Sequence, residues 1–127
     1  IDTLHKLYAV LRKSWSSSIA YKSCQSEWVS EDPSYGQCAI TATLVYDMFG
    51  GSIHRIRVEG GGTHYFNKIT GQYVDLTREQ FDLYNIEVAY EPNETMQREY
   101  CCKNPDTNAR YRQLQRNIIA YLKNNED

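Results

Sequence analysis

The sequence lacks any feature that points to a membrane or to nucleic acid. No apolar run approaches the roughly 18 residues that a membrane span needs, and no signal peptide precedes the first expected helix. The 14 basic and 16 acidic residues leave a net charge of −2, so no excess of one sign exists to attract nucleic acid or an anionic membrane. We therefore expect neither partner.

Cysteine is scarce, with four residues at positions 24, 38, 101 and 102. Their spacing contains no C-x-x-C pair of the kind that binds metal ions, and adjacent cysteines such as Cys101 and Cys102 rarely bridge because the ring is strained. We expect no cofactor and no metal. We also expect reduced thiols and a cytoplasmic location, while the start at Ile1 rather than Met leaves open a targeting segment that has been removed.

What the chain does contain is an ordinary globular composition. Hydrophobic residues make up 41% of it and charged residues 24%, which is typical of folded rather than disordered protein. A length of 127 residues is enough for one domain with its own core. We therefore expect a single domain over residues 1–127, without internal repeats.

The stretch 34–42 predicts the start of a central helix with a cysteine in its first turn. Ser34 followed three residues later by Gln37 matches a capping box, in which each side chain caps the other residue's backbone. Apolar residues then cover most of the helix circumference, which is typical of a buried helix, and Gly50-Gly51 ends it. A helix N-terminus favours a thiolate, so Cys38 is a candidate nucleophile.

Three strands are expected after this helix, over Ser52–Val58, Thr63–Lys68 and Gln72–Leu76. If the last two form an antiparallel hairpin, one register sets His64 opposite Asp75, with the two Cβ atoms about 5 Å apart. A slip of one residue would place the two side chains on different faces of the sheet. The predicted contact between His64 and Asp75 therefore depends on the hairpin register.

The remaining elements are expected to flank this unit. Apolar spacing predicts amphipathic helices over residues 1–13 and from 106 to about 123. A capping-box pattern predicts a short helix from Thr77 through Tyr84. Alternating apolar residues at 86, 88 and 90 predict an edge strand. Residues 19–33 are expected to form an irregular loop. The solvated face of the last helix is predicted to carry Arg110, Arg112, Arg116 and Lys123.

Cys38, His64 and Asp75 together meet the requirements of nucleophilic catalysis by cysteine. The reaction needs a thiolate, a histidine that holds the ion pair and moves a proton, and a group that fixes the tautomer of the histidine. Each of the three residues stands in a local context that suits one of these roles. An inert core cysteine, a structural histidine and a helix-capping aspartate are the alternatives.

Three further residues are expected around this triad. Backbone N–H groups at the helix start supply one oxyanion donor, and the Gln37 side chain is a candidate for a second. Trp28, in the irregular loop, and Tyr65, beside His64, are candidates for the walls of a substrate cleft. Plain packing is the alternative for Trp28.

The same residues resemble known motifs. Tyr35-Gly36-Gln37-Cys38 is similar to the nucleophile motif of transglutaminases, and the segments around His64 and Asp75 resemble the second and third motifs of that superfamily, in the same order. More of the chain resembles the small bacterial YunG-like family, a family without an assigned activity. The matching pieces are Leu11-x-x-Ser14-Trp15-Ser16, Trp28, Pro33, Gly36 to Ala42, Gly50-Gly51, His64 to Asn67 and Asp75 to Phe81.

The transglutaminase resemblance implies an α+β fold of papain-like or transglutaminase-like type. In that fold the helix bearing Cys38 packs on a small antiparallel sheet bearing His64 and Asp75, between the N- and C-terminal helices. The implied function is that of a cysteine-dependent hydrolase or acyltransferase, which acts on an amide or ester in a peptide, a protein or a small molecule. A binding or scaffold domain on the same fold is the alternative, and a metal site formed by the same triad, without a fourth ligand, is a third.

Overall fold

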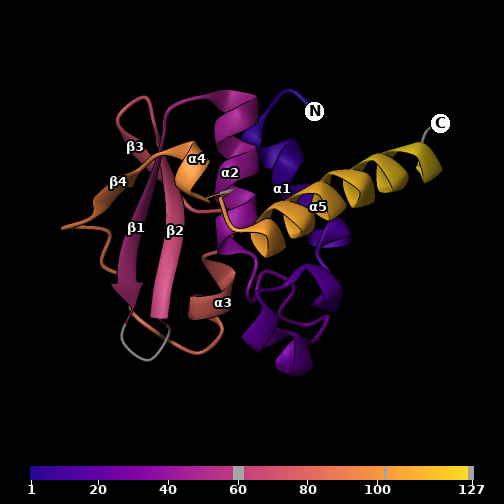
Figure 1. The fold of residues 1–127 in the computed structure, drawn as a ribbon, viewed down its shortest axis with the longest axis horizontal. Helices are drawn as coiled ribbons and strands as arrows, with labels where there is room; N and C mark the ends of the chain where they lie inside the picture. The colour runs from indigo at the N-terminus through magenta and orange to yellow at the C-terminus, as the bar shows by residue number, and fades with distance from the viewer. Residues whose placement is uncertain (59–61, 102, 126–127) are drawn as a thin grey trace.

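Three long helices and a small sheet make up the fold, which a computed structural model describes for residues 1–58, 62–101 and 103–125. Helix α2 (Cys38–Phe49) runs through the middle of the molecule, with the sheet on one side (Figure 1). Helices α1 (Leu4–Ser14) and α5 (Pro105–Asn124) pack together on the other side. The prediction of an α+β protein with flanking terminal helices is confirmed.

The sheet has four antiparallel strands in the order β3-β2-β1-β4. Its strands are β1 (Ser52–Val58), β2 (Gly62–Ile69), β3 (Gln72–Val74) and β4 (Glu94–Met96). The three predicted strands are therefore confirmed, whereas the edge strand predicted at residues 86–90 is wrong. The apolar side chains there cover a cluster around Phe66 instead, and the edge position belongs to β4, which pairs with β1.

The register between β2 and β3 differs from the predicted one by two residues. The prediction placed Gln72 opposite Asn67, whereas the structure places Val74 opposite Asn67 and ends the pairing there. Side chains alternate between the two faces of a sheet, so a shift of two residues leaves every side chain on its predicted face. Asp75, directly after β3, consequently stays on the side of the sheet where contact with His64 was predicted.

The start of α2 also corrects the sequence prediction. Gln37 rather than Ser34 is the N-cap residue, and it makes no side-chain cap bond. Gly36 has a φ of 74°, so the chain cannot run helically from Ser34 into α2. The Ser34 hydroxyl instead donates to the Thr77 carbonyl oxygen at 3.3 Å, which ties this turn to the chain after β3.

The main apolar core lies between α1, α2 and α5. It includes Leu7, Leu11, Trp15, Ile40, Leu44 and Leu114. The amphipathic pattern predicted for the last helix is confirmed, since α5 buries Tyr111, Leu114 and Ile118, whereas Leu122 is 39% exposed. None of the helices in the described ranges is both long and apolar enough to span a membrane.

Short elements connect these layers. They are the 3-10 turns η1 (Ser17–Ile19) and η2 (Lys22–Glu27), helix α3 (Glu79–Asp82) and helix α4 (Arg98–Cys101). The segment before α2, predicted as irregular, is thus mostly turns, and the predicted helix after Thr77 is shorter than expected. Both 3-10 turns precede Cys38 in the chain, and α3 begins shortly after Asp75.

Candidate active site

Cys38 occupies the first position of α2, as predicted. The first intrahelical bond is made by the Thr41 N–H to the Gln37 carbonyl oxygen at 3.1 Å, so the N–H groups of residues 38–40 have no partner inside the helix. The side chain is half-buried and lines a cleft. Cys38 therefore combines access from the cleft with the unpaired N–H groups of a helix start.

His64 and Asp75 are in direct contact, as the sequence predicted. The Nε2 atom of His64 lies 2.7 Å from Oδ2 of Asp75, and the side chains are 1% and 5% exposed. The contact forms because β3 ends at Val74 and the next residue turns its carboxylate toward β2. A carboxylate at this distance fixes both the tautomer and the orientation of the imidazole ring.

Asp75 is itself held by three further hydrogen bonds. Its Oδ1 atom accepts from the Thr77 backbone N–H at 3.2 Å and from the Thr77 hydroxyl at 3.3 Å. Its Oδ2 atom accepts from the Tyr90 hydroxyl at 2.8 Å. Sequence reasoning missed Tyr90, because a tyrosine fifteen residues away carries no local signal of this contact.

The second ring nitrogen of His64, Nδ1, is buried and has no hydrogen-bond partner within the described ranges. The sulfur of Cys38 interacts with the ring strongly enough to change the pKa values of both groups. Because Asp75 occupies Nε2, Nδ1 is the atom left to exchange a proton with Cys38.

The electrostatics of the pair favour charge separation. Burial opposes ionisation of Cys38, but a hydrogen bond with His64, the positive charge of its ring and the Tyr65 backbone outweigh that cost and lower the pKa of the thiol. Burial likewise opposes protonation of His64, yet hydrogen bonds with Asp75 and Cys38 raise its pKa to about 9. The two shifts together favour a thiolate beside an imidazolium at neutral pH.

The structure places the three remaining candidates differently. Tyr65 lines the cleft beside His64, whereas Trp28 does not line it and donates its indole N–H to the Pro33 carbonyl oxygen at 3.1 Å. The Gln37 side chain is fully buried, and its amide nitrogen donates to the Ser16 carbonyl oxygen at 3.0 Å. The Gln37 amide therefore bonds Ser16. The oxyanion donors near Cys38 that the structure offers are the backbone N–H groups of the helix.

A cleft of about 1080 Å³ opens at Cys38 and His64. One wall carries Tyr21 and Cys24 from the segment before α2, and another carries Arg55 from β1. Arg110, at the start of α5, also lines it and is 5% exposed, so its predicted place on a solvated face is wrong. No local pattern marked Arg110, because its burial results from the packing of α5 against η1.

The metal alternative finds no suitable ligand set in the part of the chain that the structure describes. No group of three or more His, Cys, Asp or Glu side chains there is arranged to hold a metal ion.

Fold and site together define a small α+β protein with a cysteine at a helix start, joined to a histidine–aspartate pair. The model of the YunG protein family matches residues 3–123, and the chain belongs to that family. It is 42% identical over 72 residues to the uncharacterised protein YunG of Bacillus subtilis (strain 168). That match covers 57% of this chain and 57% of the relative, so it spans just over half the length of that protein. No solved structure matches the chain significantly.

Proposed function

We propose that the protein is a cysteine-dependent hydrolase or acyltransferase with a papain-like or transglutaminase-like arrangement of its site. The observation that carries this proposal is the chain of contacts from Cys38 to His64 to Asp75, of which Cys38 and His64 line a cleft. A structural cysteine needs neither a lowered pKa nor access from a cleft. The scaffold alternative predicts a buried Cys38 or a His64 turned away from it, so the half-buried Cys38 and its interaction with His64 support the proposal over that alternative.

The proposed reaction begins when the Cys38 thiolate attacks the carbonyl carbon of an amide or ester. The new C–S bond forms as the carbonyl oxygen takes up negative charge, and the free N–H groups of the first turn of α2 stabilise that charge. His64 then donates the Nδ1 proton to the leaving amine or alcohol as its bond to the carbonyl carbon breaks, which leaves a thioester on Cys38.

The thioester is resolved by a second nucleophile. His64, now neutral, accepts a proton from water or from an amine as that molecule attacks the thioester carbon, and Cys38 leaves as a thiolate. Water gives a peptidase, deamidase or esterase, whereas an amine gives a transferase. Asp75 stays ionised throughout and holds the ring through Nε2.

The experiment that tests this proposal measures the rate of Cys38 alkylation by iodoacetamide against pH. The lowered pKa of the thiol leaves more thiolate at a given pH than a free thiol has, and the raised pKa of His64 keeps the imidazolium up to about pH 9. We expect the rate to rise by clearly less between pH 6.5 and 8.5 than that of a free thiol, which gains about 50-fold over that range. A profile that follows the free thiol would contradict the proposal. Intact mass after exposure to an activated ester should then show the acyl group on Cys38.

A further inference from the structure

The described side chains that line the cleft carry positive charge and no carboxylate. Arg55, Lys103 and Arg110 are among them, whereas no aspartate or glutamate of the described ranges is. The chain as a whole has a net charge of −2, so this local excess does not follow from composition. Cations gathered around a concave site raise the local concentration of anions.

Arg55 is held in place with its guanidinium available to the cleft. It donates from Nε and Nη2 to Glu94 at 3.2 and 3.3 Å and from Nη1 to the Tyr100 hydroxyl at 3.4 Å, and it lies 5.4 Å from the Tyr100 ring centre. The Tyr65 side chain also interacts with Arg55, so at most two of the five N–H donors of the guanidinium remain for a ligand. The Glu94 side chain is 68% exposed against 27% for Arg55, so the carboxylate lies on the solvent side of the pair.

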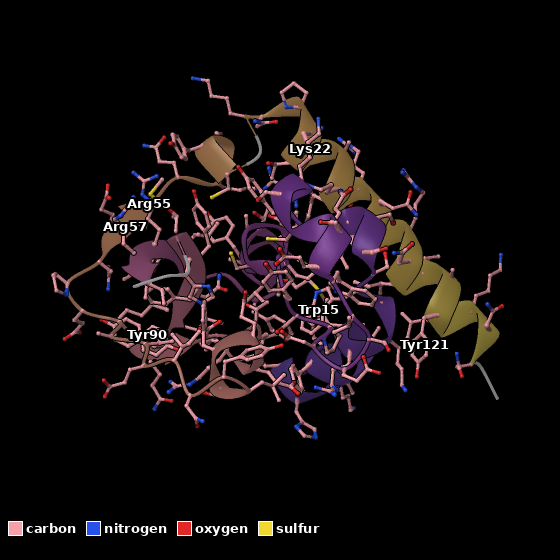
Figure 2. The ribbon with its side chains drawn as sticks, turned by 90° about the horizontal axis from the view of Figure 1, so that it is seen from below. Trp15, Lys22, Arg55, Arg57, Tyr90 and Tyr121 are labelled. Carbon is pink, nitrogen blue, oxygen red and sulfur yellow. The ribbon has the colours of Figure 1, made fainter. Side chains whose placement is uncertain are left out.

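Arg110 and Lys103 are the other two cations that line the cleft. Arg110 donates to the Ile19 carbonyl oxygen at 3.2 Å and to Asp106 at 3.0 Å, and it lies 5.7 Å from the Tyr21 ring centre. Lys103 is exposed and has no partner within the described residues. In Figure 2, Arg55 lies well apart from Lys22, which stands between the cleft-lining residues Tyr21 and Ser23. The three cations come from different parts of the chain, namely β1 for Arg55, the segment before α5 for Lys103 and α5 for Arg110.

We propose that the acyl donor for Cys38 carries an anionic group, with Arg55 and Lys103 as the residues that select it. This inference rests on the proposed function for the acyl transfer itself. A carboxylate accepts two parallel N–H bonds from a guanidinium, and the unpaired ammonium of Lys103 adds a second charge. The substrate class is thus an amide or ester whose acyl part bears a carboxylate, either an acidic peptide or a small dicarboxylic monoamide or monoester.

The test compares two alkylating agents that differ in one charge. Iodoacetate and iodoacetamide each form a C–S bond at Cys38 and release iodide, so the ratio of their rates reports the charge near the sulfur. We expect Arg55→Gln and Lys103→Gln each to lower the iodoacetate to iodoacetamide ratio by about threefold to fivefold, with a smaller loss in high salt. The matched controls Arg116→Gln and Lys123→Gln remove the same charges outside the cleft and should leave the ratio unchanged.

The outcomes separate this proposal from the proposed function. A ratio that is equal in cleft variants and controls overturns the anionic-substrate proposal even where iodoacetamide reacts rapidly. Slow alkylation with the pH profile of a free thiol overturns the proposed function. The ratio of the iodoacetate rate to the iodoacetamide rate can still be measured in that case. As a second measurement, 4-nitrophenyl hydrogen succinate should acylate Cys38 faster than 4-nitrophenyl butyrate, and Arg55→Gln should reduce that preference. The acylation rates of acidic and neutral peptide esters of equal length then distinguish a peptide substrate from a small-molecule substrate.

Discussion

Two buried histidines on neighbouring strands stand in opposite chemical situations. His54 on β1 and His64 on β2 are 7% and 1% exposed, and both stack on Phe66, with ring centres 5.7 and 6.3 Å away. The His54 ring has neutral partners on both nitrogens, Ser52 at 2.6 Å and Asn93 at 2.9 Å. The His64 ring has a carboxylate on one nitrogen and a thiol near the other.

The difference shows what turns a buried histidine into a candidate base. Neutral partners at both nitrogens satisfy His54 and hold β1 to the segment before β4, so that ring has no open position for a substrate proton. His64 keeps one nitrogen without an oxygen or nitrogen partner, and its charged form is stabilised by Asp75 and by the Cys38 thiolate. Burial is common to both rings. The charge and identity of the partners distinguish them.

The largest effect is expected from truncating His64. In His64→Ala the half-buried thiol loses the interaction with His64 and the charge that lower its pKa, while the desolvation that raises it remains. A free thiol is only a few per cent ionised at pH 7. Iodoacetamide should therefore alkylate Cys38 about 30-fold or more slowly in this variant than in the unmodified protein.

His54→Ala is the matched control for that variant. It removes a buried ring and two hydrogen bonds, so urea unfolding should show a loss of about 2 kcal/mol in the free energy of unfolding. The rate of Cys38 alkylation should stay within about twofold of the unmodified protein. Equal losses of alkylation rate in the two variants would mean that the contrast between the two histidines does not exist.

A smaller effect is expected when the partner of His64 is made to resemble that of His54. Asp75→Asn keeps an oxygen that can accept from Nε2 but removes the charge, which is the situation of Asn93 beside His54. The hydrogen bond and charge of Asp75 both raise the pKa of His64. Titration of the His64 ring by NMR should show a pKa lower by about one unit or more, with a loss of about tenfold in alkylation rate at pH 7.

Asp82→Asn is the control for this change. Asp82 pairs with Arg78 at 3.2 Å, and both side chains are about half exposed, so the neutral residue should have little effect on the His64 ring. An unchanged pKa of His64 in Asp75→Asn would remove Asp75 from its role as the orienting group.

The sequence predicts the triad better than its surroundings. The apolar helix after Cys38, the glycines that end it and the alternating strands are local patterns, and each appears in the structure. The contact between His64 and Asp75 also forms, although the predicted register was wrong by two residues. It forms because an even shift preserves the face of each side chain.

What the sequence does not predict depends on distant contacts. The buried position of Arg110 depends on the Ile19 carbonyl oxygen, 91 residues away in the chain. The predicted cap at Ser34 fails because Gly36 adopts a positive φ, which the capping-box pattern does not reveal. Alternation at residues 86, 88 and 90 marks apolar side chains correctly, but they cover Phe66 from a loop rather than from a strand. The periodicity of apolar residues indicates which side chains are buried, whereas tertiary packing decides whether the segment forms a strand or a loop.

The smallest effect is expected at Tyr90, which donates a hydrogen bond to Asp75. Its hydroxyl donates to the same carboxylate oxygen that binds His64, and its ring packs on Phe66 at 4.8 Å. Tyr90→Phe keeps the ring and removes one charge-assisted hydrogen bond, so it should cost about 1.5 kcal/mol of stability and slow alkylation of Cys38 by no more than about threefold.

Tyr73→Phe is the matched control, because Tyr73 also packs on Phe66 but bonds Glu91 and Asn93 rather than Asp75. The two variants should differ in the NMR titration of His64: the pKa of the ring should change in Tyr90→Phe and remain the same in Tyr73→Phe. If both variants leave the His64 titration unchanged, Tyr90 only packs the sheet. His64 then depends on Asp75 and Cys38 alone, and the difference between the two histidines lies entirely in their direct partners.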